Sequence, residues 1–443
     1  MTKAITHRRV LTIAAPIVLS NATVPILGAV DTGVVGQLGE AAPIGAVGIG
    51  AIILTSIYWI YGFLRMGTAG LTAQAAGRGD DPEVVAILTR VLLIGGIGGL
   101  IYILLQVPIF AGAFLISPAT PEVEALARDY MSIRIWTAPA AIALYGITGW
   151  LIALERTRAV LAIQITMNLL NIGLDLLFVL GLGWGVEGVA IATAIAELTG
   201  LAMGLYLCRE AFSVPDWRNW ARVLDRARLI TMARVNTDIL IRSLLLQAMF
   251  VSFLFLAADF GDVTLASNQV LMQFLSITAY AMDGFAFAAE ALVGRSFGAG
   301  AVPALRRTVK LTGIWSLTTG ALMAITFALI GPALIDIMAD VPEVQAEARH
   351  YLPYMIAAPI IGAAPWMLDG IFIGATRSAD MRNMMAISTV IYVIALLILL
   401  PAFGNHGLWA ALLISFAVRG VTLGLRYPAL ERAAAKNAPA FSD

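Results

Sequence analysis

Long apolar runs alternate with short polar breaks along the whole of this chain of 443 residues. Each run has about 20 or more residues, enough to cross the hydrocarbon core of a bilayer as a helix. The twelve runs cover residues 8–37, 43–77, 84–116, 121–150, 158–181, 185–211, 228–259, 264–298, 302–335, 342–374, 378–402 and 405–433. The pattern therefore predicts an all-α integral membrane protein with twelve transmembrane helices.

Composition agrees with a membrane location. Hydrophobic residues make up 60% of the chain, charged residues make up 13%, and the mean hydropathy is +0.88. An ordinary soluble domain has about 25% charged residues, and the runs leave no room for a sizeable soluble domain. The formal net charge of zero predicts no nucleic-acid partner, and the single cysteine, Cys208, excludes an internal disulfide. The first run shows no convincing cleavage site, so we expect a retained helix rather than a signal peptide.

Basic residues alternate between successive loops. The loops QLGEAAP, SPATPE, GLGWGVE, ADFGDV, DIMADVPE and AFGNH contain no Lys or Arg, whereas those between them, such as GRGDDPE and ERTR, hold most of the basic residues. Short cytoplasmic loops carry the excess of Lys and Arg. The alternation predicts a multi-pass protein of the cell (inner) membrane with both termini in the cytoplasm.

The two halves of the chain resemble each other. At a shift of about 221 residues QAAGRG faces RSFGAG, GWLIALERTR faces GIFIGATRSA, and AMGLYL faces TLGLRY. The longest polar stretch lies between the halves. We predict an N-terminal six-helix lobe over 1–212, a cytoplasmic connector over 213–228 and a C-terminal six-helix lobe over 229–443, related by an axis along the membrane normal. Paired bundles of this kind usually hold a cavity between them, although a purely structural duplication is the alternative.

Polar side chains inside the runs are the candidates for function, because an ionised group at mid-membrane costs about 2.5–3.5 kcal/mol. Asp31, Asp175 and Thr193 each lie about 9–12 Å below the outer surface at a rise of about 1.5 Å per residue. Asn171 is one turn from Asp175. Two carboxylates, an amide and a hydroxyl suit a hard cation such as Na⁺ or a shared proton. The alternative for Asp31 and Asp175 is a structural hydrogen bond to a neighbouring helix, and the alternative for Thr193 is packing in a helix interface. Pro16 predicts a bend in the helix that carries Asp31.

The second half has its own acidic set. Asp283 and Glu290 are seven residues apart and therefore share a helix face, and Asp369 lies on the tenth run. These three carboxylates predict a second proton or cation site in the cytoplasmic half of the cavity. In the alternative interpretation, Glu290 pairs with Arg295 or Arg65.

Other features of the runs suggest structural roles. Asp238 and Arg242 are four residues apart and predict an ion pair. Glu197, in contrast, lies one turn from Thr193 and is a candidate for supporting the first site, and its counterpart at the repeat offset is approximately Arg419. The glycines of IGGIGGL predict close helix packing.

Several stretches resemble a known family. These are VDTGVVGQLGEAA in the first run, DGFAFAAEALVGRSFGAG in the eighth and LDGIFIGATRSADMRN in the tenth. They resemble the multidrug and toxic compound extrusion (MATE) transporters, specifically the DinF-like branch, and the resemblance covers essentially the whole chain. It implies a V-shaped pair of six-helix lobes and cation-driven export of small molecules by alternating access. It also implies that Asp31, Asn171, Asp175 and Thr193 form the cation site of the N-terminal lobe.

We therefore expect a secondary active multidrug exporter that exchanges H⁺ or Na⁺ for small amphipathic or cationic organic compounds. It should need no cofactor and should be a monomer in the lipid bilayer. An enzyme is disfavoured, because the chain has neither HExxH nor DDxxD and its His residues lie outside the runs or at their ends. A lipid-linked precursor flippase of the same superfamily is the alternative. A flippase would need a strongly cationic cavity to hold a pyrophosphate. Arg65 is the one arginine counted deep in a run, so the sequence does not predict such a cavity.

Overall fold

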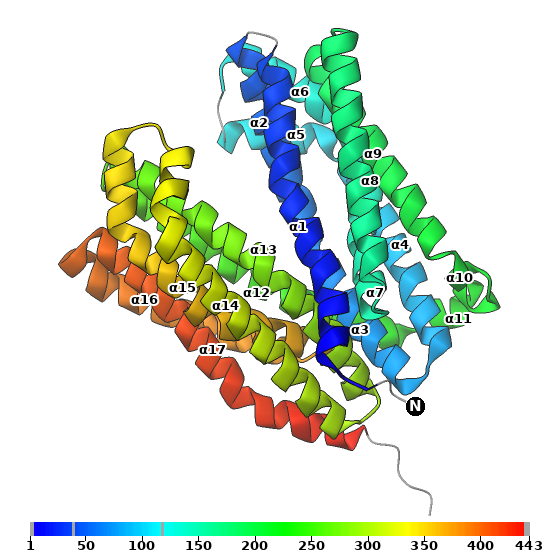
Figure 1. Cartoon of the computed structure of the whole chain (residues 1–443). Coiled ribbons are helices and arrows are strands. Elements are labelled where there is room, and N and C mark those ends of the chain that lie inside the picture. Colours follow the sequence, from blue (N-terminus) through cyan, green and yellow to red (C-terminus); the bar gives the residue numbers. More distant parts are fainter. Residues whose placement is uncertain (1–3, 38–39, 117–118, 438–443) are drawn as a thin grey trace, which may run out of the picture. The chain divides into compact units, whose positions relative to one another are not determined.

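The computed structural model describes residues 4–37, 40–116 and 119–437, apart from the side chains of residues 24, 26–29, 31 and 32. All regular secondary structure in this part of the chain is helical (Figure 1). The elements are α1 (His7–Gly36), α2 (Ala41–Trp59), α3 (Gly62–Arg78), α4 (Asp81–Leu104), α5 (Gln106–Ile116), α6 (Pro121–Arg134), η1 (Ile135–Thr137), α7 (Ala138–Ala153), α8 (Thr157–Asp175), η2 (Leu176–Gly181), α9 (Gly185–Leu207), α10 (Arg209–Phe212), η3 (Pro215–Arg218), α11 (Trp220–Val223), α12 (Arg226–Ala258), α13 (Asp262–Gly298), α14 (Val302–Met338), α15 (Pro342–Gly374), α16 (Ser378–Phe403) and α17 (Asn405–Lys436).

Every predicted run corresponds to one helix or to consecutive helical segments. The run 43–77 is divided into α2 and α3 at Ile60 and Tyr61, and the run 84–116 is divided into α4 and α5 at Leu105. Among the described residues, eleven helical segments are long and apolar enough to cross a membrane. The remaining predicted run is α1, a helix with several side chains outside the described residues.

Local sequence explains where two of the long segments begin. Gly79, just before α4, has a φ of +72°, a left-handed conformation that glycine adopts without strain. The Asp80 carboxylate then accepts a hydrogen bond from the Glu83 amide at 3.2 Å. Thr120 caps α6 in the same way, since its hydroxyl accepts from the Val123 amide at 3.4 Å. Such caps satisfy amide groups that have no acceptor within the helix.

The helices pack as two compact units. The first consists of the described residues of 1–18, 69–79 and 230–443, and the second consists of those of 19–68 and 80–229. Residues 1–18 and 69–79 thus pack with the second half of the chain. The predicted division into one lobe on each side of a connector stays a prediction.

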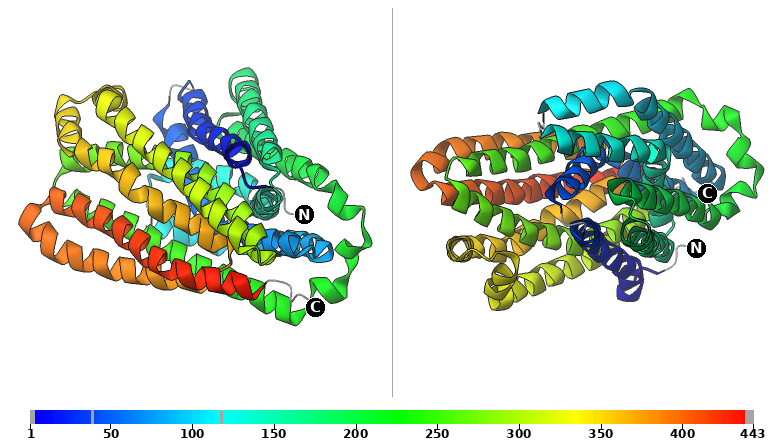
Figure 2. Two further views of the ribbon diagram at one scale, coloured as in Figure 1. Left: turned by 60° about the horizontal axis from the view of Figure 1, so that its bottom comes forward. Right: turned by 90° about the horizontal axis from the view of Figure 1, so that it is seen from above.

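Each unit is a bundle of helices in contact along their lengths. In the first unit, α13 packs against α14 and α15, and α16 lies along α17 (Figures 1 and 2). In the second unit, α2 packs against α6, α4 against α7, and α8 against α9. Each helix satisfies its backbone hydrogen bonds within itself, as a segment that crosses lipid must.

The predicted connector, residues 213–228, is folded onto α4 within the second unit. Arg90 donates from Nε to the Val223 carbonyl at 2.7 Å and from Nη2 to the Arg222 carbonyl at 2.6 Å. Its Nη1 pairs with Glu83 at 2.7 Å. The hydrogen bonds of the buried Arg90 therefore fix this stretch against α4.

The predicted close packing at IGGIGGL is confirmed for most of its glycines. A Cβ atom added to Gly95 would lie 2.7 Å from the Ala143 Cα atom, and one added to Gly99 would overlap the Pro139 backbone. Gly96 faces open space. Small residues on one face of α4 thus let α7 approach to backbone contact.

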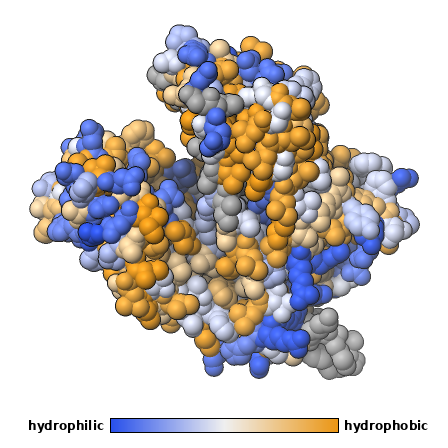
Figure 3. Space-filling model, turned by 45° about the horizontal axis from the view of Figure 1, so that its top comes forward, coloured by the Kyte–Doolittle hydropathy of each residue, from blue (hydrophilic) through white to orange (hydrophobic). Residues whose placement is uncertain are grey.

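Large apolar side chains cover the outer faces of the helices. Leu329 and Leu397 have 76% and 73% of their surface exposed, and Phe255 has 73%. Figure 3 shows broad hydrophobic areas on the face in view. A water-soluble protein rarely exposes contiguous apolar areas of this extent, whereas lipid contact stabilises them.

Candidate functional site

The first predicted site is partly assembled on α8. Asp175 and Asn171 are both buried, with 0% and 1% of their surface exposed. The Asn171 Nδ2 atom donates a hydrogen bond to the Asp175 Oδ2 atom at 2.6 Å. This contact follows from their spacing of one helical turn. Because an amide is neutral, the bond orients the carboxylate without cancelling its charge.

The helix changes its winding immediately after this carboxylate. The segment η2, Leu176–Gly181, is a π-helix, and the Leu182 amide donates to the Leu177 carbonyl at 2.9 Å. π-turns are rare and occur frequently at functional sites. The apolar pattern of this run did not distinguish π from α winding, so the sequence analysis missed this feature.

The other two members of the set are described less fully. Thr193 lies on α9, which packs against α8, and its hydroxyl donates to the Val189 carbonyl at 2.9 Å. The hydroxyl oxygen can still accept a hydrogen bond or bind a cation. Asp31 belongs to α1, but its side chain lies outside the described residues. The structure thus joins Asn171 to Asp175, and the complete set of four stays a prediction.

The predicted bend at Pro16 also stays a prediction, since α1 is one helix from His7 to Gly36. Among the described residues, no group of three or more His, Cys, Asp and Glu side chains could hold a metal ion. That search does not test the Na⁺ set, which includes an amide, a hydroxyl and Asp31.

A buried ion pair lies elsewhere in the second unit. Glu197, on α9, pairs with Arg134 of α6 at 2.5 Å, and their side chains are 12% and 10% exposed. Arg134 also donates from Nη1 to the Tyr130 hydroxyl at 2.7 Å, and the Thr137 hydroxyl donates to Glu197. The sequence analysis counted only Arg65 as a deep arginine, which was wrong. Arg134 stands inside a predicted run and was therefore identifiable.

A second buried cluster surrounds Asp369 in the first unit. Its Oδ2 atom accepts hydrogen bonds from Nη2 of Arg242, on α12, and from Nη2 of Arg419, on α17, the latter at 3.1 Å. These three residues are 6%, 7% and 4% exposed, and their formal charges add up to +1. Asp238 pairs with Arg382 at 2.5 Å, a partner that the sequence analysis did not anticipate.

The remaining predicted acidic residues lie on α13. Glu290 is buried and Asp283 is half-buried. The Glu290 carbonyl lies so close to Gly374 that a Cβ atom there would overlap it, so α13 packs tightly against α15, the helix of Asp369. A coupling role for Asp283, Glu290 and Asp369 stays a prediction, and the structure adds that Asp369 is paired with two arginines.

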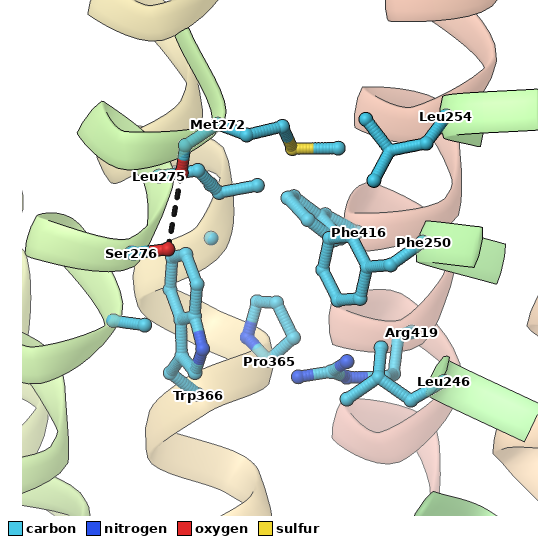
Figure 4. Close-up of a pocket in the computed structure, with 12 residues that line it drawn as sticks. Leu246, Phe250, Leu254, Met272, Leu275, Ser276, Pro365, Trp366, Phe416 and Arg419 are labelled. Carbon is cyan, nitrogen blue, oxygen red and sulfur yellow. Dashed lines mark hydrogen bonds between the residues drawn. The ribbon is translucent and has the colours of Figure 1, made fainter. Parts of the chain in front are cut away.

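A cavity of about 350 Å³ lies inside the first unit, between α12, α13, α15 and α17. This volume is within the range of small-molecule sites. Figure 4 shows Arg419 at the same end as Trp366 and Pro365, with Met272 and Leu254 at the other end. The apolar side chains that line most of the cavity include Leu246, Phe250, Leu254, Met272, Trp366 and Phe416.

Arg419 is the only charged residue among the described residues that line this cavity. Its Nε atom is buried and has no hydrogen-bond partner in the described part of the chain. A buried donor without an acceptor costs about 1–3 kcal/mol. Ser276, the hydroxyl-bearing residue of the lining, donates to the Met272 carbonyl of its own helix at 3.1 Å.

Sequence comparison relates the chain to known transporters. The MatE family model matches residues 16–177 and 239–398, one segment in each half, which supports the internal duplication. The DNA damage-inducible protein F of Escherichia coli (strain K12) is 37% identical over 418 residues, which cover 93% of this chain and 90% of that protein. The multidrug resistance protein MdtK of Edwardsiella ictaluri is 24% identical and covers 96% of both chains.

Solved structures share the fold. The Vibrio cholerae MATE transporter VcmN in the bent form has a TM-score of 0.86 at 20% identity, covering 98% of each chain. A MATE structure in the bent conformation has a TM-score of 0.88 at 17% identity, covering 98% of this chain and 100% of that one. These matches confirm the predicted all-helical membrane fold.

The apolar helices together with the match to the MatE family model over both halves define a multi-pass membrane transporter rather than an enzyme. The chain belongs to the MATE family, as its family match and its relative in Escherichia coli show.

Proposed function

We propose that this chain is a secondary active exporter that exchanges H⁺ or Na⁺ for small amphipathic or cationic organic compounds. Relatives named as multidrug resistance proteins support this class of substrate. We further propose that it works as a monomer in the cell membrane with both termini in the cytoplasm. The alternation of basic and non-basic loops supports this orientation.

The buried Asn171–Asp175 pair carries the proposal for coupling. Its carboxylate is 0% exposed within an apolar helix and accepts a hydrogen bond from a neutral amide. A proton or a hard cation stabilises such a carboxylate when it binds. We place Asp31 and Thr193 beside this pair as the remaining ligands, so the set would bind H⁺ or Na⁺.

Coupling then requires only a difference between two states. If the occupied and empty forms of the set prefer different conformations of α1 or different substrate affinities, cation entry drives export. The π-helical turn after Asp175 and the proline at residue 16 are places where the backbone departs from ideal α-helix hydrogen bonding. Both lie on helices that carry an acidic member of the set.

Transport by purified protein in proteoliposomes tests this function. We expect efflux of a cationic dye such as ethidium to respond to an imposed pH gradient without Na⁺, or to a Na⁺ gradient at fixed pH. Asp31→Asn and Asp175→Asn should each abolish the response, while Asp259→Asn, at an exposed position, should not. Full gradient-driven efflux by both site variants would overturn the coupling proposal.

The lipid-linked precursor flippase remains the alternative. A pyrophosphate headgroup calls for several cationic side chains, whereas Arg419 is the only charged residue among the described residues of the cavity lining. Flipping of a lipid-linked saccharide with no efflux of any organic compound would favour the alternative.

A further inference from the structure

We propose that the cavity around Arg419 binds compact amphipathic molecules that carry one anionic group, such as a carboxylate on an aromatic or alicyclic body. This inference names a substrate class and in that respect rests on the proposed export function. The binding itself requires only the structure of the first unit.

The charge arrangement carries the first part of the argument. Arg242 and Arg419 both donate to the same oxygen of Asp369, and of these three side chains only Arg419 lines the cavity. A cationic group entering beside Arg419 would meet like charge, whereas an anion would meet opposite charge.

The hydrogen bonds of Arg419 carry the second part. A guanidinium has five N–H donors in a planar fork, which suits a carboxylate. The Arg419 Nη2 atom is engaged by Asp369, but the buried Nε atom has no partner among the described residues. A ligand carboxylate would supply the missing acceptor after a small adjustment of the side chain.

The shape and lining of the cavity define the rest of the ligand. Arg419 and Trp366 lie at one end, and Met272 and Leu254 lie at the other (Figure 4). A molecule with its anionic group at Arg419 would place its apolar body against aromatic and thioether side chains, which contact flat rings favourably. The volume of about 350 Å³ favours a compact body over a long chain.

Calorimetric binding to the full chain in nanodiscs tests this site, with empty nanodiscs as the blank. The probes are 1-naphthaleneacetate, its neutral amide, and laurate as a fatty acid from the membrane. We expect naphthaleneacetate to bind at least tenfold more tightly than the amide. Arg419→Gln should remove this difference, Arg419→Lys should keep part of it, and Arg306→Gln, at an exposed arginine, should leave it unchanged.

The outcomes separate the site from its alternatives. Leu254→Trp fills the cavity without altering a charge, so it should weaken the binding of both naphthyl probes equally. This variant tests the site even if Arg419→Gln does not fold. Binding of laurate but not of naphthaleneacetate, lost in Arg419→Gln, would keep the anion site at Arg419 but overturn the compact body of the ligand. Equal affinity for acid and amide, or unchanged discrimination in Arg419→Gln, would overturn the proposal. Loss of gradient-driven efflux in proteoliposomes would leave these binding results as they are, so the two proposals fail separately.

Discussion

Replacing Asp369 with asparagine should destabilise the protein strongly, because the change leaves two buried arginines without their shared carboxylate. The Arg419 Nη2 and Asp369 Oδ2 atoms are 3.1 Å apart, and the two side chains are 5% and 9% exposed. At an effective dielectric constant of about 20, one such pair attracts with about 5 kcal/mol. Removing one partner of a buried ion pair typically costs about 3–5 kcal/mol, so we expect a loss of that size.

The assay is denaturant unfolding of the purified protein in detergent, followed by tryptophan fluorescence. Asp336→Asn is the matched control, since Asp336 pairs with Arg349 and their side chains are 43% and 45% exposed. An exposed pair is worth at most about 1 kcal/mol. The double variant Asp369→Asn with Arg419→Gln should recover part of the loss, because one uncompensated charge disappears. A loss from Asp369→Asn no greater than that of the control would refute the reasoning.

The remaining predictions concern packing, reactivity and the second ion pair. Gly99→Val should lower the free energy of unfolding by about 1–3 kcal/mol, because the added side chain would overlap a neighbouring backbone. Gly96→Val should have little effect, because Gly96 faces open space. Denaturant unfolding of both variants checks this prediction. The Cys208 side chain is buried, with 0% of its surface exposed, so a thiol reagent does not reach it in the folded protein. Maleimide should therefore label the native protein slowly and the unfolded chain quickly, and fast native labelling would contradict the burial. Glu197→Gln should lower the melting temperature, and adding Arg134→Gln should restore part of the loss, because the two residues form an ion pair. Additive losses from the two substitutions would show that the residues do not act as a pair.

The helices could be predicted from sequence because the bilayer imposes a length and a polarity on each run. The run 342–374 and α15 coincide, and the first run differs from α1 by a single residue at each end. Interruptions such as Ile60–Tyr61 and the π-helix after Asp175 were not predicted, because an apolar pattern is the same for intact and broken helices.

The buried polar groups show a similar division. The Asn171–Asp175 bond could be predicted because partners one turn apart on a helix must lie close. The partners of Asp369 are 127 and 50 residues away along the chain, so their choice depends on how three helices pack. Periodicity identifies which residues are buried together on one face, but it does not identify the residue that faces them from another helix.

The Arg134–Glu197 and Asp369–Arg419 ion pairs have opposite polarity in the two halves, with a consequence for how a duplicated chain assembles. Glu197 and Arg419 stand at approximately equivalent repeat positions, and each finds its partner in its own half, Arg134 and Asp369 respectively. If a helix of one half docked in the place of its counterpart, Arg134 would meet Arg419, or Asp369 would meet Glu197. Like charges facing each other in lipid are strongly unfavourable, so the exchange is rejected. The charges therefore disfavour exchange of α9 with its counterpart α17 between the two bundles.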